Sequence, residues 1–95
     1  MRDYELVTIV NPEVDDEGIL AVVDKVNRFI TERGGVVDGT EQWGRKKLAY
    51  SIKRFSEGSY SFTRFNLEPK AVKELEVNLR AEDEILRHLV TKAGE

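Results

Sequence analysis

The chain of 95 residues contains no cysteine, which excludes disulfide bridges, thiol catalysis and thiolate metal sites. It also lacks a long apolar run: no stretch approaches the roughly 20 residues that span a bilayer. Its first five residues do not resemble the start of a signal peptide. We therefore expect a cytoplasmic protein that is not inserted in a membrane, with residues 1–95 forming one domain around a modest core.

Residues typical of catalytic sites are also scarce. Histidine occurs once, at His88, and no carboxylate or nucleophile is identifiable as its partner, so we interpret it as an ordinary strand residue, with an RNA contact as the alternative. The acidic groups at 15–17 and 82–84 fit a helix start and a turn better than a metal site. The sequence has no glycine-rich phosphate loop, nucleophile elbow or zinc spacing. We expect no enzymatic activity, no cofactor, no metal and no small-molecule substrate.

The net charge of −3 is unevenly distributed along the chain. Residues 1–44 contain ten acids and four bases, residues 45–67 one acid and six bases, and residues 68–95 seven acids and five bases. The middle segment is therefore locally basic, with a charge of +5. Lysine and arginine neutralise phosphates and release counterions, so nucleic acid stays a candidate partner despite the acidic total.

Hydrophobic periodicity predicts six elements. In chain order we expect a strand over 4–10, a helix between Pro12 and Gly34, a long bent strand over 36–52, a strand over 59–67, a helix from Pro69 to residue 80 or 81, and a strand over 85–90. Residues 56–58 predict the turn of a hairpin, and 92–95 a frayed tail. This order is that of an α+β, ferredoxin-like two-layer sandwich: a four-stranded antiparallel sheet with two helices on one face.

Such a sandwich leaves one face of its sheet without helices. If Leu6 and Phe65 face the helices, the alternation of side chains along a strand places four apolar residues on the other face. They are Val7, Ile9, Tyr60 and Phe62. An exposed apolar patch of this kind indicates a binding partner, because soluble monomers rarely expose large ones. The alternative is that the two aromatics are ordinary core residues.

The most distinctive segment is residues 45–54, which contain five bases, no acid and one tyrosine, and which follow Trp43 closely. Bases in such a segment favour phosphate binding, while aromatics beside them stack on nucleobases or pack on a protein. The alternative is a basic hairpin that is merely solvated.

These residues resemble the family of the sixth protein of the bacterial small ribosomal subunit, over nearly the whole chain. The matching stretches are Met1–Leu6 with Asn11 and Pro12, Gly44–Ile52, Gly58–Tyr60 and Leu79–Leu89. The most specific is the glycine and basic run that leads into Leu-Ala-Tyr-Ser-Ile. The resemblance implies a structural and assembly role without enzymatic activity. It further implies binding to the central domain of small-subunit (16S) ribosomal RNA jointly with the eighteenth small-subunit protein.

The resemblance also suggests individual contacts by position. The candidates for ribosomal RNA are Arg2, Arg45, Lys46, Lys47, Lys53, Arg54, Arg80 and Arg87. The candidates for the protein partner are Trp43, Leu48 and Tyr50, to which the expected exposed face adds Tyr60 and Phe62.

Three other uses of this element order compete with that interpretation. An RNA-recognition motif stacks bases on aromatics of its central strands, but the first strand here offers Val7 and Ile9 instead. A small-molecule-binding regulatory module, dimeric through an exposed sheet or edge, is compatible with the fold and predicts binding that is indifferent to salt. An acylphosphatase-like catalyst is disfavoured, because no phosphate-cradling loop with a neighbouring arginine and asparagine is identifiable.

Overall fold

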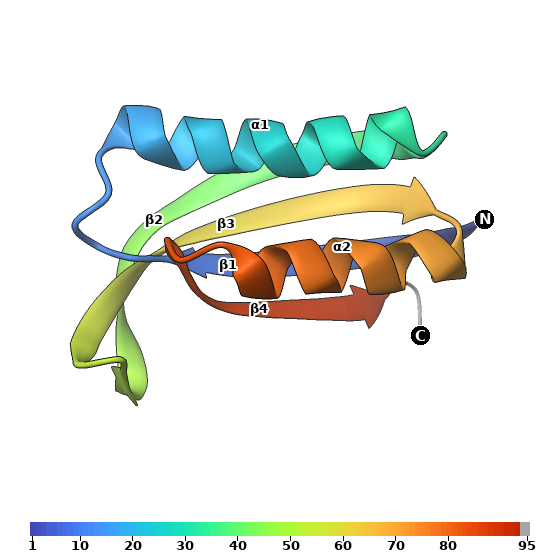
Figure 1. Cartoon of the computed structure of the whole chain (residues 1–95). Helices are drawn as coiled ribbons and strands as arrows, with labels where there is room; N and C mark the ends of the chain where they lie inside the picture. The colour runs from blue at the N-terminus through green and yellow to red at the C-terminus, as the bar shows by residue number, and fades with distance from the viewer. Residues whose placement is uncertain (94–95) are drawn as a thin grey trace.

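The computed structural model describes residues 1–93 and contains six elements. They are β1 (Arg2–Val10), α1 (Asp16–Glu32), β2 (Val36–Ile52), β3 (Phe55–Leu67), α2 (Pro69–Ala81) and β4 (Ile85–Lys92). All strand pairs are antiparallel, in the order β2-β3-β1-β4, and both helices lie on one side of the sheet (Figure 1). The predicted α+β, ferredoxin-like sandwich is confirmed. Neither of the two helices in this part of the chain combines the length and the apolarity that crossing a membrane requires.

Helix α1 begins and ends where the sequence predicts. The Asp15 side chain accepts a hydrogen bond from the Gly18 N–H at 2.8 Å and so satisfies one of the free donors of the first turn. Past the last turn, Gly34 adopts a φ of +80°, a conformation that glycine tolerates without steric cost. The side of α1 that faces the sheet is buried, from Ile19 through Val26 to Ile30. The acidic group at 15–17 is thus a helix start, as expected.

The core lies between the helices and the sheet. Phe65 and Leu67 of β3 are fully buried, and Leu6 of β1 and Leu75 of α2 are nearly so. The ring of Tyr4 stacks on that of Phe65 with centroids 5.6 Å apart. Burying a side chain of this size stabilises the fold by about 1.5 to 3 kcal/mol, so these few contacts anchor both helices to the sheet.

Strands β2 and β3 form a hairpin that extends past the rest of the sheet (Figure 1). The pairing of β3 with β1 ends at Ser59, opposite Val10, whereas its pairing with β2 continues to Phe55, opposite Ile52. The register of β2 shifts at Gly39 and again at Gly44. Such bulges bend a strand, and this explains the predicted long, bent strand over 36–52.

The turn of this hairpin was predicted at the wrong position. It lies at Lys53 and Arg54, both with positive φ, while residues 56–58 belong to β3. Gly58 has a different role there, because a Cβ at this position would overlap the Cγ2 atom of Ile9. Glycine inside a strand often marks such a close approach rather than a turn.

The end of the chain also differs from expectation. Strand β4 continues to Lys92, and the Ala93 N–H donates to the Asp3 carbonyl oxygen at 2.9 Å. The predicted frayed tail is therefore wrong for residues 92 and 93, whose positions are fixed by pairing with β1. Residues 94 and 95 lie outside the described part of the chain.

Candidate nucleic-acid and protein interface

The sheet face that the helices leave free is the first candidate surface. In the observed register Ile9 lies between Tyr60 and Arg87, and Val7 lies between Phe62 and Leu89. The alternate residues of β3, such as Ser61 and Phe65, are buried towards the helices. The predicted placement of Val7, Ile9, Tyr60 and Phe62 on one face is confirmed, but the expected exposure is not: Ile9 is only 8% exposed and the other three are half-buried. We call this surface the uncovered face.

Aromatic rings and cations alternate along the uncovered face. Trp43 of β2 stacks on Phe62 of β3 with centroids 5.2 Å apart and planes 10° from parallel. The Lys46 ammonium lies 5.4 Å from the Trp43 centroid and 5.9 Å from that of Tyr60. The Arg64 guanidinium lies 5.7 Å from the Phe62 centroid. These contacts restrain the rings of the uncovered face.

A shallow depression of about 190 Å³ lies beside this aromatic cluster. It is lined by Val7, Ile9, Tyr60, Arg87, His88 and Leu89. Three neighbouring strands thus contribute to it, and Leu89 stands at its edge with 54% of its surface exposed. The depression is mainly apolar, with one cation on its lining.

The second candidate surface is the basic hairpin, residues 45–54. None of its five bases forms an ion pair with a carboxylate of residues 1–93. Arg45 instead donates from Nη2 to the carbonyl oxygen of Pro12 at 2.7 Å. The positive charge of the hairpin is therefore not neutralised within the described chain and is accessible to an external anion.

Two of these bases form a turn of unusual conformation. Lys53 has a φ of 49° and Arg54 a φ of 71°, so both occupy the left-handed region. Asparagine and glycine are the residues that two-residue hairpin turns of this kind favour. A turn with two cationic residues at these positions is less stable than one with asparagine and glycine. Backbone outliers of this kind often occur at functional sites.

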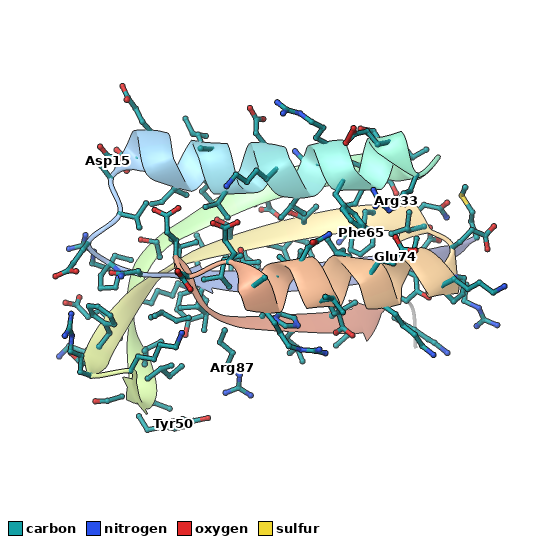
Figure 2. All side chains as sticks on the ribbon, viewed as in Figure 1. Asp15, Arg33, Tyr50, Phe65, Glu74 and Arg87 are labelled. Atoms are coloured by element: carbon teal, nitrogen blue, oxygen red, sulfur yellow. The ribbon has the colours of Figure 1, made fainter. Side chains whose placement is uncertain are left out.

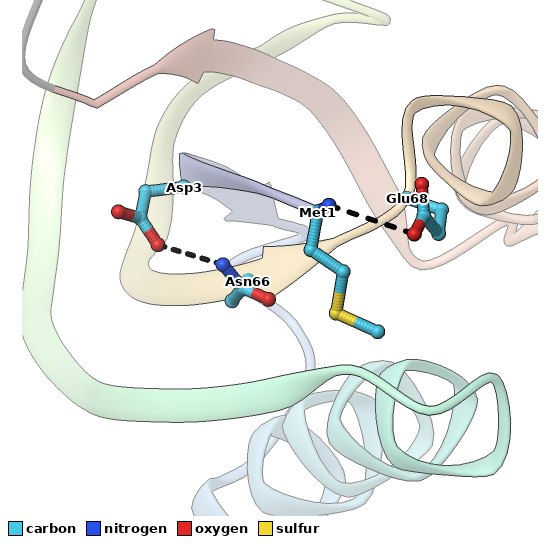
Figure 3. A network of polar contacts seen from close by, with 4 residues as sticks. All are labelled: Met1, Asp3, Asn66 and Glu68. Carbon is cyan, nitrogen blue, oxygen red and sulfur yellow. Dashed lines mark hydrogen bonds and ion pairs between the residues drawn. The ribbon is translucent and has the colours of Figure 1, made fainter.

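The remaining predicted RNA contacts do not gather at the hairpin. Arg2 lies at the opposite end of the sheet, about 26 Å from Val10 at the usual strand rise of about 3.3 Å per residue. That end is held by an ion pair of 3.5 Å between the Met1 amino group and Glu68, and by a 2.9 Å hydrogen bond from Asn66 to Asp3 (Figure 3). Arg80 is exposed on the last turn of α2, in the helix layer.

Arg87, by contrast, lies beside the protein-partner candidates. Its Nη1 donates to the hydroxyl oxygen of Tyr50 at 2.8 Å, so β4 and the basic hairpin meet across the edge of the uncovered face (Figure 2). Tyr50 is 64% exposed, whereas Leu48, on the same hairpin, is half-buried. The structure thus brings Trp43, Tyr50, Tyr60 and Phe62 to one region and adds Arg87 to it.

Two residues of this region were not among the site residues predicted from the sequence. Leu89 reaches the uncovered face because β4 pairs with β1, a register that periodicity along β4 does not reveal. Arg64 follows Phe62 by two residues along β3, and residues two apart share a face of the sheet. Its place on the uncovered face could therefore have been predicted from the sequence.

The side chain of His88 points away from the uncovered face, although the residue borders the depression there. Its Nε2 lies 3.7 Å from a carboxylate oxygen of Glu76 in α2, and its side chain is 14% exposed. This position agrees with an ordinary strand residue and not with a phosphate contact. Within residues 1–93, no three histidine or acidic side chains gather in a way that could hold a metal ion.

Comparisons with known proteins agree with these features. The family model described as ribosomal protein S6 matches residues 3–92. The small ribosomal subunit protein bS6 of Moorella thermoacetica is 38% identical over 95 residues, which cover 100% of this chain and 97% of that protein. The bS6 protein of Clostridium botulinum is 42% identical over 90 residues, 95% of this chain and 96% of that one.

A solved structure is similar as well. The crystal structure of 30S ribosomal protein S6 from Thermotoga maritima matches with a TM-score of 0.90 and 36% identity, covering 96% of this chain and 86% of that chain. The match of family model, sequence and fold over nearly the whole length confirms the resemblance inferred from the motifs. The chain belongs to the ribosomal protein S6 family.

Proposed function

We propose that this chain binds the central domain of 16S ribosomal RNA through its basic hairpin, jointly with the eighteenth small-subunit protein, which docks on the uncovered face. As a member of its family the chain is a structural, non-enzymatic constituent of the bacterial small ribosomal subunit in the cytoplasm. Within that role, residues 1–95 act as one domain whose two surfaces meet two partners.

The charge of the basic hairpin is the observation that supports RNA binding most strongly. Five bases lie within ten residues, at the end of a hairpin that projects from the sheet, in a chain with a net charge of −3. Ion pairing with the chain's own carboxylates would have cancelled this charge, and no such pair occurs among the described residues. Phosphates are the abundant anions in a ribosomal setting, so they are the counterions we assign to it.

Arg2 and Arg80 are proposed as separate RNA contacts. Arg2 lies at the far end of the sheet and Arg80 in the helix layer, so one RNA segment reaches both of them and the basic hairpin only by following the surface around the protein. Their loss should weaken binding less than loss of the hairpin bases, because isolated exposed charges are largely screened at physiological salt.

The uncovered face supports protein rather than RNA as its partner. Base stacking in an RNA-recognition motif uses aromatics on the central strands, and the central strand β1 presents Val7 and Ile9 here. The adjoining depression of about 190 Å³ is also smaller than the roughly 300 to 1,000 Å³ of small-molecule sites. Apolar side chains of a protein suit this surface better than either competitor.

Salt-dependent binding tests the proposal. The affinity of the full chain for a central-domain rRNA fragment is measured from low to high salt, with and without the eighteenth protein. We expect the affinity to fall steeply with salt and to rise when the protein is present. The variant Lys46→Ala/Lys47→Ala should lower the slope of log K against log salt by about one unit per lost phosphate contact.

A matched control removes two lysines from the helix layer. Lys70→Ala/Lys73→Ala changes the net charge equally but at exposed positions of α2. It should leave the slope nearly unchanged. If the slope of log K against log salt falls equally in both double variants, RNA binding depends on the net charge of the chain and not on the basic hairpin. Binding that is indifferent to salt would favour the small-molecule module instead.

A further inference from the structure

We infer that the depression on the uncovered face receives one apolar side chain of the protein partner, and that Arg87 pairs with a carboxylate next to that side chain. This inference rests on the proposed function, because it describes how the protein partner is recognised. It assigns Arg87 to the protein interface, whereas the family resemblance suggested an RNA contact.

The shape of the depression favours a single anchoring side chain. Its floor is formed by Val7 and Ile9 of the central strand, and Tyr60 and Leu89 flank it on the neighbouring strands. A volume of about 190 Å³ is too small for most ligands but suits one large aliphatic or aromatic group. Binding energy in protein interfaces concentrates where such a group fills a pocket whose surroundings exclude water.

The position of Arg87 explains why the anchor should be accompanied by a carboxylate. Arg87 lines the depression, and its guanidinium is held by the Tyr50 hydroxyl at 2.8 Å, which uses only one of five N–H donors. No carboxylate of residues 1–93 forms an ion pair with it. A guanidinium fixed in this way offers two parallel donors to a planar carboxylate.

The charges of the uncovered face favour an acidic partner at this end. Near the depression the charged side chains are Arg87 and Lys46, which lies over Tyr60. Of the acids of β1, Asp3 lies at the opposite end and is bonded to Asn66 at 2.9 Å, whereas Glu5 is two residues from Val7 and pairs with Arg64 at 3.5 Å. On β2, Glu41 lies opposite Phe62. An acidic group of the partner therefore meets Arg87, which has no ion pair within residues 1–93, while the charge of Glu5 beside Val7 is balanced by Arg64.

The apolar lining distinguishes a protein from a nucleic acid as the occupant. A phosphodiester backbone gains nothing from contact with Leu89, which is 54% exposed, whereas an apolar side chain buries that surface and its own. Phosphate binding by Arg87 is a separate possibility, which the variant Arg87→Gln tests.

The test compares three single variants of the full chain in binding to the purified eighteenth protein without RNA, by titration calorimetry. Leu89→Asp places a carboxylate on the lining and should weaken binding about 30-fold. Leu89→Lys keeps an apolar stem and adds the opposite charge, so it should weaken binding only about three-fold. Leu20→Asp is the matched control, because Leu20 is 55% exposed on α1, and should change nothing.

Each outcome has a defined meaning. If the wild-type chain does not bind the eighteenth protein, the proposed docking of that protein on the uncovered face is wrong, and the inference about the depression fails with it, whereas RNA binding by the basic hairpin is tested separately by the salt titration. If the wild type binds and Leu89→Asp binds equally well, only the inference about the depression is overturned. If Leu89→Asp and Leu89→Lys weaken binding equally, the inferred carboxylate of the partner is not next to this position, and that part of the inference is overturned. Thermal unfolding of each variant confirms that the compared proteins are folded.

Arg87→Gln gives an independent measurement. It removes the cation but keeps a polar group, and we expect it to weaken protein binding about ten-fold while leaving the salt slope of rRNA binding unchanged. A slope lower by about one unit with unaltered protein binding would show that Arg87 binds phosphate, and would overturn the inference.

Discussion

The two faces of strand β3 differ in where they carry their large side chains. Towards the helices, the part of β3 near the basic hairpin buries Ser59, Ser61 and Thr63, while Phe65 fills the core farther along. On the opposite face the same part carries Tyr60 and Phe62. Folding stability alone favours the larger apolar side chains inside. This reversal supports the proposal that the uncovered face binds a partner.

The buried serines of β3 support this interpretation. The Ser61 hydroxyl oxygen is buried and has no hydrogen-bond partner in the described structure. A buried polar atom without a partner costs about 1 to 3 kcal/mol, so this part of the inner face contributes little stability for its area. The far end of the sheet therefore contributes more to the stability of the fold, and the end near the basic hairpin is where we propose that partners bind.

Truncating an aromatic residue on each face is the strongest test of this comparison. Phe65→Ala removes a fully buried ring and should lower the free energy of unfolding by about 3 to 5 kcal/mol. Phe62→Ala removes a ring of the uncovered face and its stack on Trp43, and should cost only about 1 kcal/mol. Urea denaturation measures both. Similar losses would mean that the two faces contribute equally to the fold.

Trp43→Ala should separate binding from stability. The Trp43 ring is 42% exposed and stacks on Phe62, so its removal should weaken association with the eighteenth protein by about 2 kcal/mol and lower the free energy of unfolding by only about 1 kcal/mol, as expected for loss of the same stack. Val77→Ala, at a position 59% exposed on α2, is the control and should leave the association unaltered. Calorimetry with the purified partner measures the difference, and a matching loss in both variants would remove Trp43 from the interface.

The turn of the basic hairpin should show opposite effects on stability and binding. Lys53→Asn/Arg54→Gly installs residues that tolerate positive φ, so the free energy of unfolding should rise by about 1 kcal/mol. The same change removes two cations and should lower the salt slope of rRNA binding by nearly two units. Denaturation and salt titration of one variant measure both effects. A more stable variant with an unaltered slope would show that these two cations do not contact phosphate.

Tyr50→Phe should have the smallest effect. It keeps the ring and removes only the hydroxyl that accepts the hydrogen bond from Arg87. Because both groups are at the surface, we expect a loss of about 0.5 kcal/mol in binding of the protein partner and none in stability. The effect should vanish when Arg87 is already Gln, which a double-mutant cycle measures. Equal effects in both backgrounds would show that this hydrogen bond does not position Arg87.

Much of the fold was predictable because its local signals agree with one another. The bounds of β2 were predicted without error, since Gly35 precedes an extended run that continues to Ile52. The hairpin turn was not, because Gly58 has the composition of a turn residue but serves a close approach to Ile9. That role depends on a strand nearly fifty residues earlier, and sequence patterns near Gly58 carry no trace of it.

The candidate site was predictable in composition but not in arrangement. The basic segment and the aromatics of β3 were identifiable from residue type and alternation alone. The depression was not, because it requires β4 to pair with β1 in a register that places Leu89 beside Val7. The contact between Tyr50 and Arg87 likewise depends on the bend of β2, which brings together residues from two strands that are not neighbours in the sheet.

The sequence by itself determined the order of the elements, the face of each that is buried and the basic segment of the hairpin. Each of these follows from interactions between residues a few positions apart, so periodicity and turn chemistry encode them. Only the tertiary structure decided which exposed groups share a surface: that Arg87 belongs with Tyr50, that Leu89 borders the depression, that Arg2 lies at the far end of the sheet and that Arg80 lies in the helix layer. Strand register and bulges set those neighbours through long-range packing, which no local pattern specifies.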